Sequence, residues 1–245
     1  MSQQELTQRI AAVQERIVRA ARRAGRDPTE ITLVAVSKTH GADAVVAAYA
    51  AGLRVFGENR VEEAGPKAQA VAALLGGPHP HGANGLEWHM IGHLQSRKAE
   101  DVLPWAAMVQ SVDSVKLAAR LSRFCHAAGR ELPILLEVNV SGEASKYGFI
   151  PAELPTQVEA IAALPGLRLQ GLMTMAPIVP DGLNRPAVVR PVFAGLRRLR
   201  DDLVRRFPIV DWRHLSMGMT DDFEVAIEEC ATMVRIGRAI FEERI

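Results

Sequence analysis

Residues 31–38 read I-T-L-V-A-V-S-K, and this stretch decides which class of fold the sequence predicts. Five of its eight residues are apolar, which is typical of a strand that is buried on both faces of a parallel sheet. The residues that follow, from Thr39 to Gly41, are typical of a turn. Lys38 is therefore expected at the carboxyl end of a strand, where α/β folds place their binding and catalytic groups.

The position of Lys38 has two interpretations. Partial burial would lower the pKa of its amine and make the amine a better nucleophile toward carbonyl groups. Alternatively, its stem packs on the core and its ammonium group reaches water. Only five of the 29 Lys and Arg residues are lysines, so the chain mostly uses arginine where it needs a positive charge. Because an amine can form a Schiff base and a guanidinium cannot, this composition favours the first interpretation.

Seven further short apolar stretches follow along the chain, and polar loops succeed them. The predicted strands cover residues 31–38, 53–56, 86–91, 107–110, 134–140, 167–172, 214–215 and 232–236. Helices are predicted from Leu6 to about Gly25 and over residues 43–51, 60–75, 96–102, 114–129, 151–163, 186–206 and 221–229. This alternation, without an evident linker, predicts an α/β fold, a single (β/α)8 TIM-type barrel over residues 1–245. A doubly wound open sheet is the alternative.

The composition excludes several classes of function. The chain is 48% hydrophobic and 23% charged, as is usual for a globular protein, and its net charge of +1 predicts no nucleic-acid partner. Cys125 and Cys230 lie far apart and indicate neither a disulfide framework nor a metal site. A signal peptide and a membrane-spanning run are not evident, so a cytoplasmic location and no membrane partner are expected. Residues 76–85 are expected to form a flexible loop with solvated His79 and His81.

A second candidate site lies in Ser216-Met217-Gly218-Met219-Thr220-Asp221, where the seventh strand is expected to lead into a helix. Backbone N–H groups at a helix N-terminus bind anions, and the helix dipole favours negative charge there. The alternative is that Thr220 or Asp221 simply caps the helix. Gly237 follows the eighth strand and would let another N–H group approach the same anion. Loops after strands seven and eight commonly form the phosphate site of such barrels.

Other polar residues fall just after predicted strands or within them. Arg235 alternates with apolar residues, so it should face the barrel mouth and need an acceptor, with a structural salt bridge as the alternative. Asn59 either orients a ligand or shapes a turn. His89 and His93 lack a carboxylate motif that would complete a zinc site, so no metal site is expected. Without a G-x-G-x-x-G or P-loop sequence, a dinucleotide or triphosphate ligand is poorly supported.

Seven sequence blocks together carry a family resemblance over nearly the full length. They read L-V-A-V-S-K-T-H, F-G-E-N-R-V-E-E-A, W-H-M-I-G-H-L-Q-S-R-K, E-V-N-V-S-G-E-A-S-K-Y-G-F, G-L-M-T-M-A-P, L-S-M-G-M-T-D-D-F-E-V-A-I and V-R-I-G-R-A-I-F. In this order the blocks resemble those of the pyridoxal-phosphate homeostasis proteins. The resemblance implies the barrel of the alanine racemase N-terminal domain and binding of pyridoxal 5′-phosphate (PLP).

The same resemblance implies roles for individual residues. Lys38 matches the lysine that forms a covalent Schiff base with PLP, and Arg235 matches an arginine beside the pyridine nitrogen. The remaining implied cofactor contacts are the phosphate loop with Ser216, Gly218, Thr220 and Gly237, and the rim residues Asn59, His93 and Met175. Lys146 matches a loop lysine linked to a second PLP site or to handing PLP over. Arg238 replaces a residue that is frequently a small hydroxyl, and it is expected either to lose that phosphate contact or to make it itself.

These observations lead to an expected function with two alternatives. We expect a monomeric protein that binds PLP at Lys38 and acts in PLP homeostasis by buffering it or delivering it to PLP-dependent apoenzymes, with little or no amino-acid turnover. The first alternative is a PLP-dependent amino-acid racemase, but racemases of this fold take their second base, a tyrosine, from an added β domain that is not expected here. The second alternative is a barrel enzyme that acts on a phosphorylated metabolite without PLP.

Overall fold

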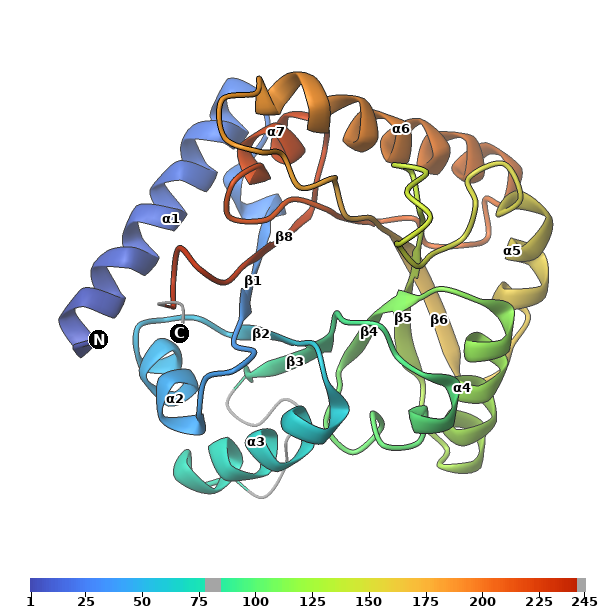
Figure 1. Cartoon of the computed structure of the whole chain (residues 1–245). Helices are drawn as coiled ribbons and strands as arrows, with labels where there is room; N and C mark the ends of the chain where they lie inside the picture. The colour runs from blue at the N-terminus through green and yellow to red at the C-terminus, as the bar shows by residue number, and fades with distance from the viewer. Residues whose placement is uncertain (78–84, 242–245) are drawn as a thin grey trace.

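Eight parallel strands close into a barrel in the order of the sequence, as the computed structural model shows for residues 1–77 and 85–241 (Figure 1). The strands are β1 (Thr32–Val36), β2 (Val55–Glu58), β3 (Glu87–Met90), β4 (Met108–Val112), β5 (Leu132–Glu137), β6 (Leu167–Met173), β7 (His214–Ser216) and β8 (Met233–Ile236). The first strand pairs with the last, with Val34 opposite Arg235, so the sheet has no edge. The predicted barrel is confirmed, and the open sheet is excluded.

Helices surround the barrel and follow most of the strands (Figure 1). In the described residues they are α1 (Gln3–Arg23), α2 (Ala42–Ala50), α3 (Val61–Leu74), α4 (Val115–Ala127), α5 (Pro155–Ala162), α6 (Arg185–Arg206) and α7 (Phe223–Glu228). The predicted helix over 96–102 is wrong. Only a single 3-10 turn, η3 (Ser96–Lys98), forms there, because Pro104 soon ends the segment and no side chain caps its start.

Several predicted element ends shift by a few residues. Helix α2 begins after Gly41 rather than at Asp43, and α7 begins after Asp222 rather than at Asp221. Strand β5 ends at Glu137, before the predicted end at residue 140. Val138 still donates to the carbonyl of Met173 on β6, but the chain beyond it turns to pair with Phe149. His79, His81 and the chain end beyond Phe241 lie outside the described residues, so the expectations for them have no structural counterpart.

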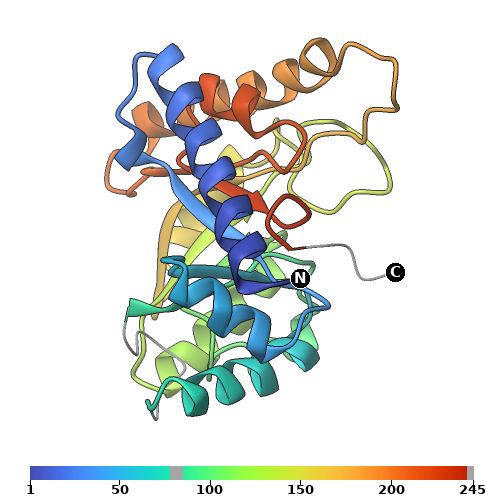
Figure 2. The same cartoon turned by 90° about the vertical axis from the view of Figure 1, so that its left-hand side faces the viewer.

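Helix α1 takes the place of a helix after β8, where the described chain forms only a turn up to Phe241. A capping box between Ser2 and Glu5 starts α1, and its buried face packs against α7 and α2. Figure 2 shows α1 running across the outside of the barrel, with the loops after β5 and β6 projecting together on one side. In the described part of the chain, no helix has the length and apolar character needed to cross a membrane.

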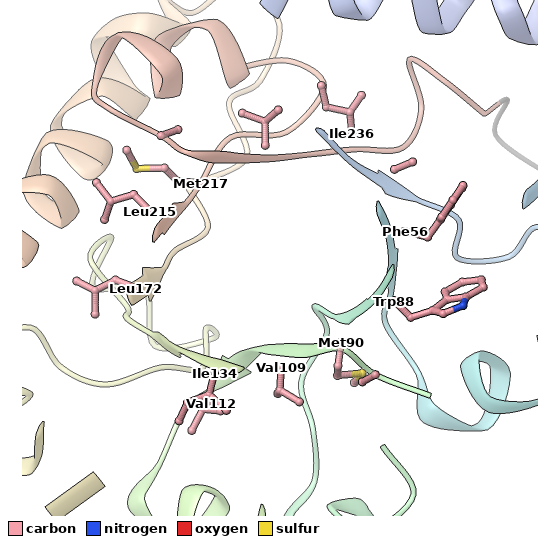
Figure 3. Packing of buried hydrophobic residues seen from close by; sticks show 14 of the residues in the cluster. Phe56, Trp88, Met90, Val109, Val112, Ile134, Leu172, Leu215, Met217 and Ile236 are labelled. Carbon is pink, nitrogen blue, oxygen red and sulfur yellow. The ribbon is translucent and has the colours of Figure 1, made fainter. Parts of the chain in front are cut away.

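The core has two parts, one on each side of the strands. Outward-facing residues such as Phe56, Trp88 and Leu215 pack between the sheet and the helices (Figure 3). A smaller apolar cluster fills the barrel, and it consists of Val34, Met108, Leu135, Met173 and Met233 with the partly buried Val55 and Met175. Since this inner cluster is small, buried polar residues occupy the rest of the interior and lie close to the carboxyl ends of the strands.

Candidate functional site

Lys38 lies in a turn just beyond β1, where the N–H group of His40 donates to the carbonyl of Ser37 over 3.1 Å. The next residue, Thr39, has a φ of 66°, a left-handed conformation that costs energy for a residue other than glycine. Lys38 is exposed, which corrects the expectation of partial burial. Because β1 ends at Val36, two residues before Lys38, the side chain of Lys38 lies outside the core.

Four of the predicted site residues line one cavity of about 510 Å³ at the carboxyl end of the barrel. They are Lys38, Thr220, Arg235 and Gly237, and Arg238 lines the same cavity. These residues come from the loops after β1, β7 and β8 and from β8 itself. Because β1 and β8 are neighbours in the closed barrel, the two ends of the sequence contribute to one site.

Arg235 is a buried cation at this cavity, with 4% of its surface exposed. Its Nη1 donates to the hydroxyl of Ser216 over 2.6 Å, and its Nη2 donates to the carbonyl of Thr174 over 2.9 Å. Burial lowers the pKa of Arg235 to about 10, although the charges of Glu137 and Asp222 oppose this shift. Within the described residues Arg235 forms no ion pair, so the salt-bridge alternative does not apply and its charge is held by neutral acceptors.

The Ser216 hydroxyl lies inside the barrel and continues a chain of hydrogen bonds from Arg235. It donates to Oε1 of Gln110 over 2.6 Å, and Nε2 of Gln110 lies 2.8 Å from Nδ1 of His89. Ser216 is fully buried and does not line the cavity. His89 is thus the far end of this chain and a partner of Gln110.

The loop from Met217 to Asp222 is tightly packed against α7. Gly218 has a φ of 92°, and a Cβ atom added to it would lie 2.6 Å from Cβ of Ala226 and 2.8 Å from Cα of Phe223. Only glycine fits this position without strain. The carboxylate of Asp222 accepts from the N–H group of Met219 over 2.6 Å, and burial raises the pKa of that carboxyl.

Several backbone donors around the cavity are open. The N–H groups of Thr220, Asp221 and Gly237 donate to none of the acceptors in the described part of the chain. Gly237 lies close to β1, since a Cβ atom added to it would be 3.3 Å from the carbonyl oxygen of Val36. The Asp221 side chain does not cap α7 but pairs with Arg238. Open N–H groups and cations are the groups that anion-binding sites use, and here they line the cavity together with the carboxylates of Asp221 and Asp222.

Asn59 and His93 line a neighbouring cavity of about 620 Å³ rather than the one that contains Lys38. Nδ1 of His93 lies 2.9 Å from Oδ2 of Asp113, and its ring stacks on Tyr147 with centroids 3.6 Å apart and planes 10° apart. The loop that carries Tyr147 therefore packs onto the rim at His93.

Met175 and Lys146 lie at the same end of the barrel but outside the cavity of Lys38. Met175 packs on the inner apolar cluster, and its carbonyl accepts from Nζ of Lys146 over 3.4 Å. Lys146 also pairs with Glu143 of its own loop. In the described residues, no group of three His, Cys, Asp or Glu side chains is placed to hold a metal ion.

The match to known proteins covers almost the whole chain. Residues 9–244 match the family model described as alanine racemase, N-terminal domain. The pyridoxal phosphate homeostasis protein of Pseudomonas aeruginosa is 45% identical over 98% of this chain and 96% of its own length. The chain belongs to the pyridoxal phosphate homeostasis protein family. The member from Escherichia coli K12 is 41% identical over 98% of this chain, and the one from Bos taurus is 41% identical over 96%.

Solved structures agree with this family. PipY of Synechococcus elongatus, in a structure with PLP bound, is 34% identical with a TM-score of 0.79, and the match covers 96% of this chain and 99% of PipY. An alanine racemase from Clostridium difficile shares only the fold, with 14% identity and a TM-score of 0.67 over 94% of this chain and 55% of the racemase. This member of the homeostasis protein family therefore matches PipY along its whole length and the racemase only in part.

Sequence reasoning missed one titratable group of this family member. Glu137, at the end of β5, is 3% exposed. Its pKa is raised to about 7, mainly by burial and also by the charge of Asp113, while the charge of Arg235 opposes the shift. The available signal was the two-residue spacing of Pro133, Leu135 and Glu137, which places the three side chains on one face of the strand. Leu135 belongs to the inner apolar cluster, so this face is the barrel interior. The predicted strand over residues 134–140 contains Glu137, but this acidic residue is assigned no role from the sequence.

Proposed function

We propose that this chain binds PLP in the cavity lined by Lys38, Thr220, Arg235 and Gly237, and that it acts in PLP homeostasis by reversible capture. The observation that carries the proposal is that a lysine amine, a buried cation and open backbone donors line one cavity of about 510 Å³. The naming of its relatives and the PLP bound to PipY support the same ligand.

The residues present fit the three polar parts of PLP. When bound, PLP supplies an aldehyde that a primary amine can attack to form a covalent link. Lys38 is the amine at this cavity that would form that link. The N–H groups of Thr220 and Gly237 would donate to the phosphate, where Gly218 keeps the loop close to α7. Arg235, which has no carboxylate partner in the described residues, would face the ring nitrogen and disfavour a second positive charge there.

The exposure of Lys38 supports capture and release rather than permanent storage. Because the side chain is exposed, water and the amines of other molecules can reach the link that it forms. A lysine sealed in the core would hold its ligand more permanently. The position of the amine at the mouth of the cavity is thus compatible with buffering PLP or passing it to apoenzymes.

Replacing Lys38 tests the proposal. Purified protein is titrated with PLP, reduced with borohydride, and analysed by absorbance and by peptide mass. We expect added mass at Lys38 in the wild type, none in Lys38→Ala, and an unchanged melting temperature because Lys38 is exposed. Lys116→Ala, which removes another exposed lysine, is the matched control and should retain the adduct. A stoichiometric adduct in Lys38→Ala would show that the assignment is wrong.

A further inference from the structure

A buried ion-pair cluster contacts the chain directly before and after Lys38. At its centre is Lys67 of α3, whose Nζ donates to Oε1 of Glu58 over 2.7 Å and to Oε1 of Glu63 over 2.8 Å. The same ammonium group donates to the carbonyl oxygen of Ser37 over 2.8 Å. All three of its hydrogen bonds are therefore used, and one of them ends on the residue before Lys38.

The two carboxylates of the cluster extend these contacts to both sides of Lys38. The hydroxyl of Ser37 donates to Oε1 of Glu58 over 2.6 Å. The N–H group of Thr39 donates to Oε1 of Glu63 over 2.7 Å. Since Thr39 has the left-handed φ of 66°, the bond to Glu63 holds the residue after Lys38 in a conformation that it would not otherwise favour.

The cluster is costly to bury, and this argues that it does more than fill space. Lys67 is 7% exposed and Glu58 is fully buried, with its Oε2 atom left without a hydrogen-bond partner. Burial raises the pKa of Glu58, and the hydrogen bond and charge of Lys67 oppose that shift. Buried ion pairs often contribute less to stability than apolar residues of similar size would. If the turn from Ser37 to Thr39 served only to connect two elements, it would not require a buried lysine between two carboxylates.

Secondary structure places each member of the cluster. Glu58 is the last residue of β2, which pairs with β1 through Val36 and Gly57. Glu63 and Lys67 are four residues apart on α3 and so lie on the same face of that helix. Neither Glu58, Glu63 nor Lys67 lines the cavity of Lys38, so they can act on a ligand there only through the turn.

We propose that Lys67, Glu58 and Glu63 are positioning residues that hold the turn from Ser37 to Thr39 so that the amine of Lys38 points at the cavity. This inference rests on the proposed function of Lys38 and adds the reason why its backbone is held from both sides. The contacts end on the flanking main chain and on the Ser37 hydroxyl, so the side chain of Lys38 itself stays free to react.

Glu63 is the member of the cluster best suited to a test. Replacing Lys67 would leave Glu58 as a buried carboxylate without its cation and would destabilise the fold itself. Glu63 has a side chain that is 31% exposed, and Glu63→Ala removes the acceptor of the Thr39 N–H group from a helix position that tolerates alanine. Glu63→Gln keeps a carbonyl oxygen for that bond and is the conservative variant. Glu62→Ala is the matched control, because Glu62 lies on the same turn of α3 but pairs with Lys98.

The experiment distinguishes an effect on the position of the Lys38 amine from an effect on the shape of the cavity. One readout is the rate at which PLP is trapped on Lys38 by borohydride. The other is the affinity for pyridoxine 5′-phosphate, which carries an alcohol in place of the aldehyde and cannot be trapped. We expect trapping in Glu63→Ala to be roughly tenfold to a hundredfold slower, with affinity for pyridoxine 5′-phosphate and the melting temperature nearly unchanged. Glu63→Gln should recover most of the rate, and Glu62→Ala should match the wild type.

Two results would overturn the inference. Trapping at the wild-type rate in Glu63→Ala would show that the cluster does not position Lys38. An equal loss of pyridoxine 5′-phosphate affinity would show that the cluster maintains the whole cavity and has only a structural role. Failure of the proposed function looks different, because wild-type protein would then form no adduct at Lys38, and this inference would end with it.

Discussion

The guanidinium of Arg235 donates to the hydroxyl of Ser216 over 2.6 Å inside the barrel. Both residues lie on neighbouring strands, β8 and β7, and both are buried. The sequence predicts Ser216 for the phosphate loop and Arg235 for the ring nitrogen, but the structure joins them in one hydrogen-bond chain. Ser216 is thereby placed to orient the cation that lines the cavity.

Ser216→Ala should therefore weaken the site as well as the fold. Arg235 and Gln110 each lose a hydrogen-bond partner. We therefore expect the free energy of unfolding to fall by about 1–3 kcal/mol. Affinity for PLP should also fall, as measured by titration, while urea unfolding reports the stability. Ser122→Ala is the control, since it removes a buried hydroxyl that donates to the carbonyl of Pro165 outside the barrel. Unchanged PLP affinity in Ser216→Ala would contradict this role.

Gly218→Ala should remove the preference of the site for a phosphate group. The added methyl group would lie 2.6 Å from Cβ of Ala226, so the loop would have to move away from α7. We expect wild-type protein to bind PLP far more tightly than pyridoxal, and Gly218→Ala to bind the two with similar, weak affinity. Gly52→Ala is the control, because Gly52 also has a positive φ, of 100°, but open space around it. Equal affinities for PLP and pyridoxal in the wild type would contradict the proposal that this loop binds the phosphate group.

Glu137 should make the folded protein less stable as the pH rises toward neutral. Its pKa is raised from 4.5 to about 7, so between these values the folded protein keeps a proton that the unfolded chain has released. The contribution of Glu137 to stability therefore falls as pH rises through this window, by about 3 kcal/mol in total. Glu137→Gln cannot ionise and should be more stable than the wild type at pH 8 but not at pH 4. Urea unfolding of both proteins checks this, and an equal difference at the two pH values would be evidence against it.

Amino-acid turnover should be slow in the PLP-loaded protein. Arg235 is a fixed positive charge, which would keep the ring nitrogen unprotonated and weaken the withdrawal of electrons from an amino acid. NMR of L-alanine in deuterated water measures loss of the α-proton signal, with Lys38→Ala as the control. We expect exchange well below about one per second. Faster exchange that depends on Lys38 would favour the racemase alternative.

The sequence by itself determined the alternation of strands and helices, the place of Lys38 after the first strand and the loop around Gly218, whereas closure of the barrel was decided by the pairing of β1 with β8. These features are local, because a run of apolar residues, a turn and a glycine can be read within a few neighbouring positions. The full set of blocks also determined the family, since their order extends over most of the chain.

Only the tertiary structure decided which polar side chains form hydrogen bonds with one another. Ser216 meets Gln110 across 106 positions of sequence, and Lys67 reaches Ser37 across 30. Such contacts depend on which strands become neighbours when the barrel closes and on which side chains that closure turns inward. Burial in the closed barrel then raises the pKa of Glu137. Lys38 stays exposed because its strand ends two residues earlier.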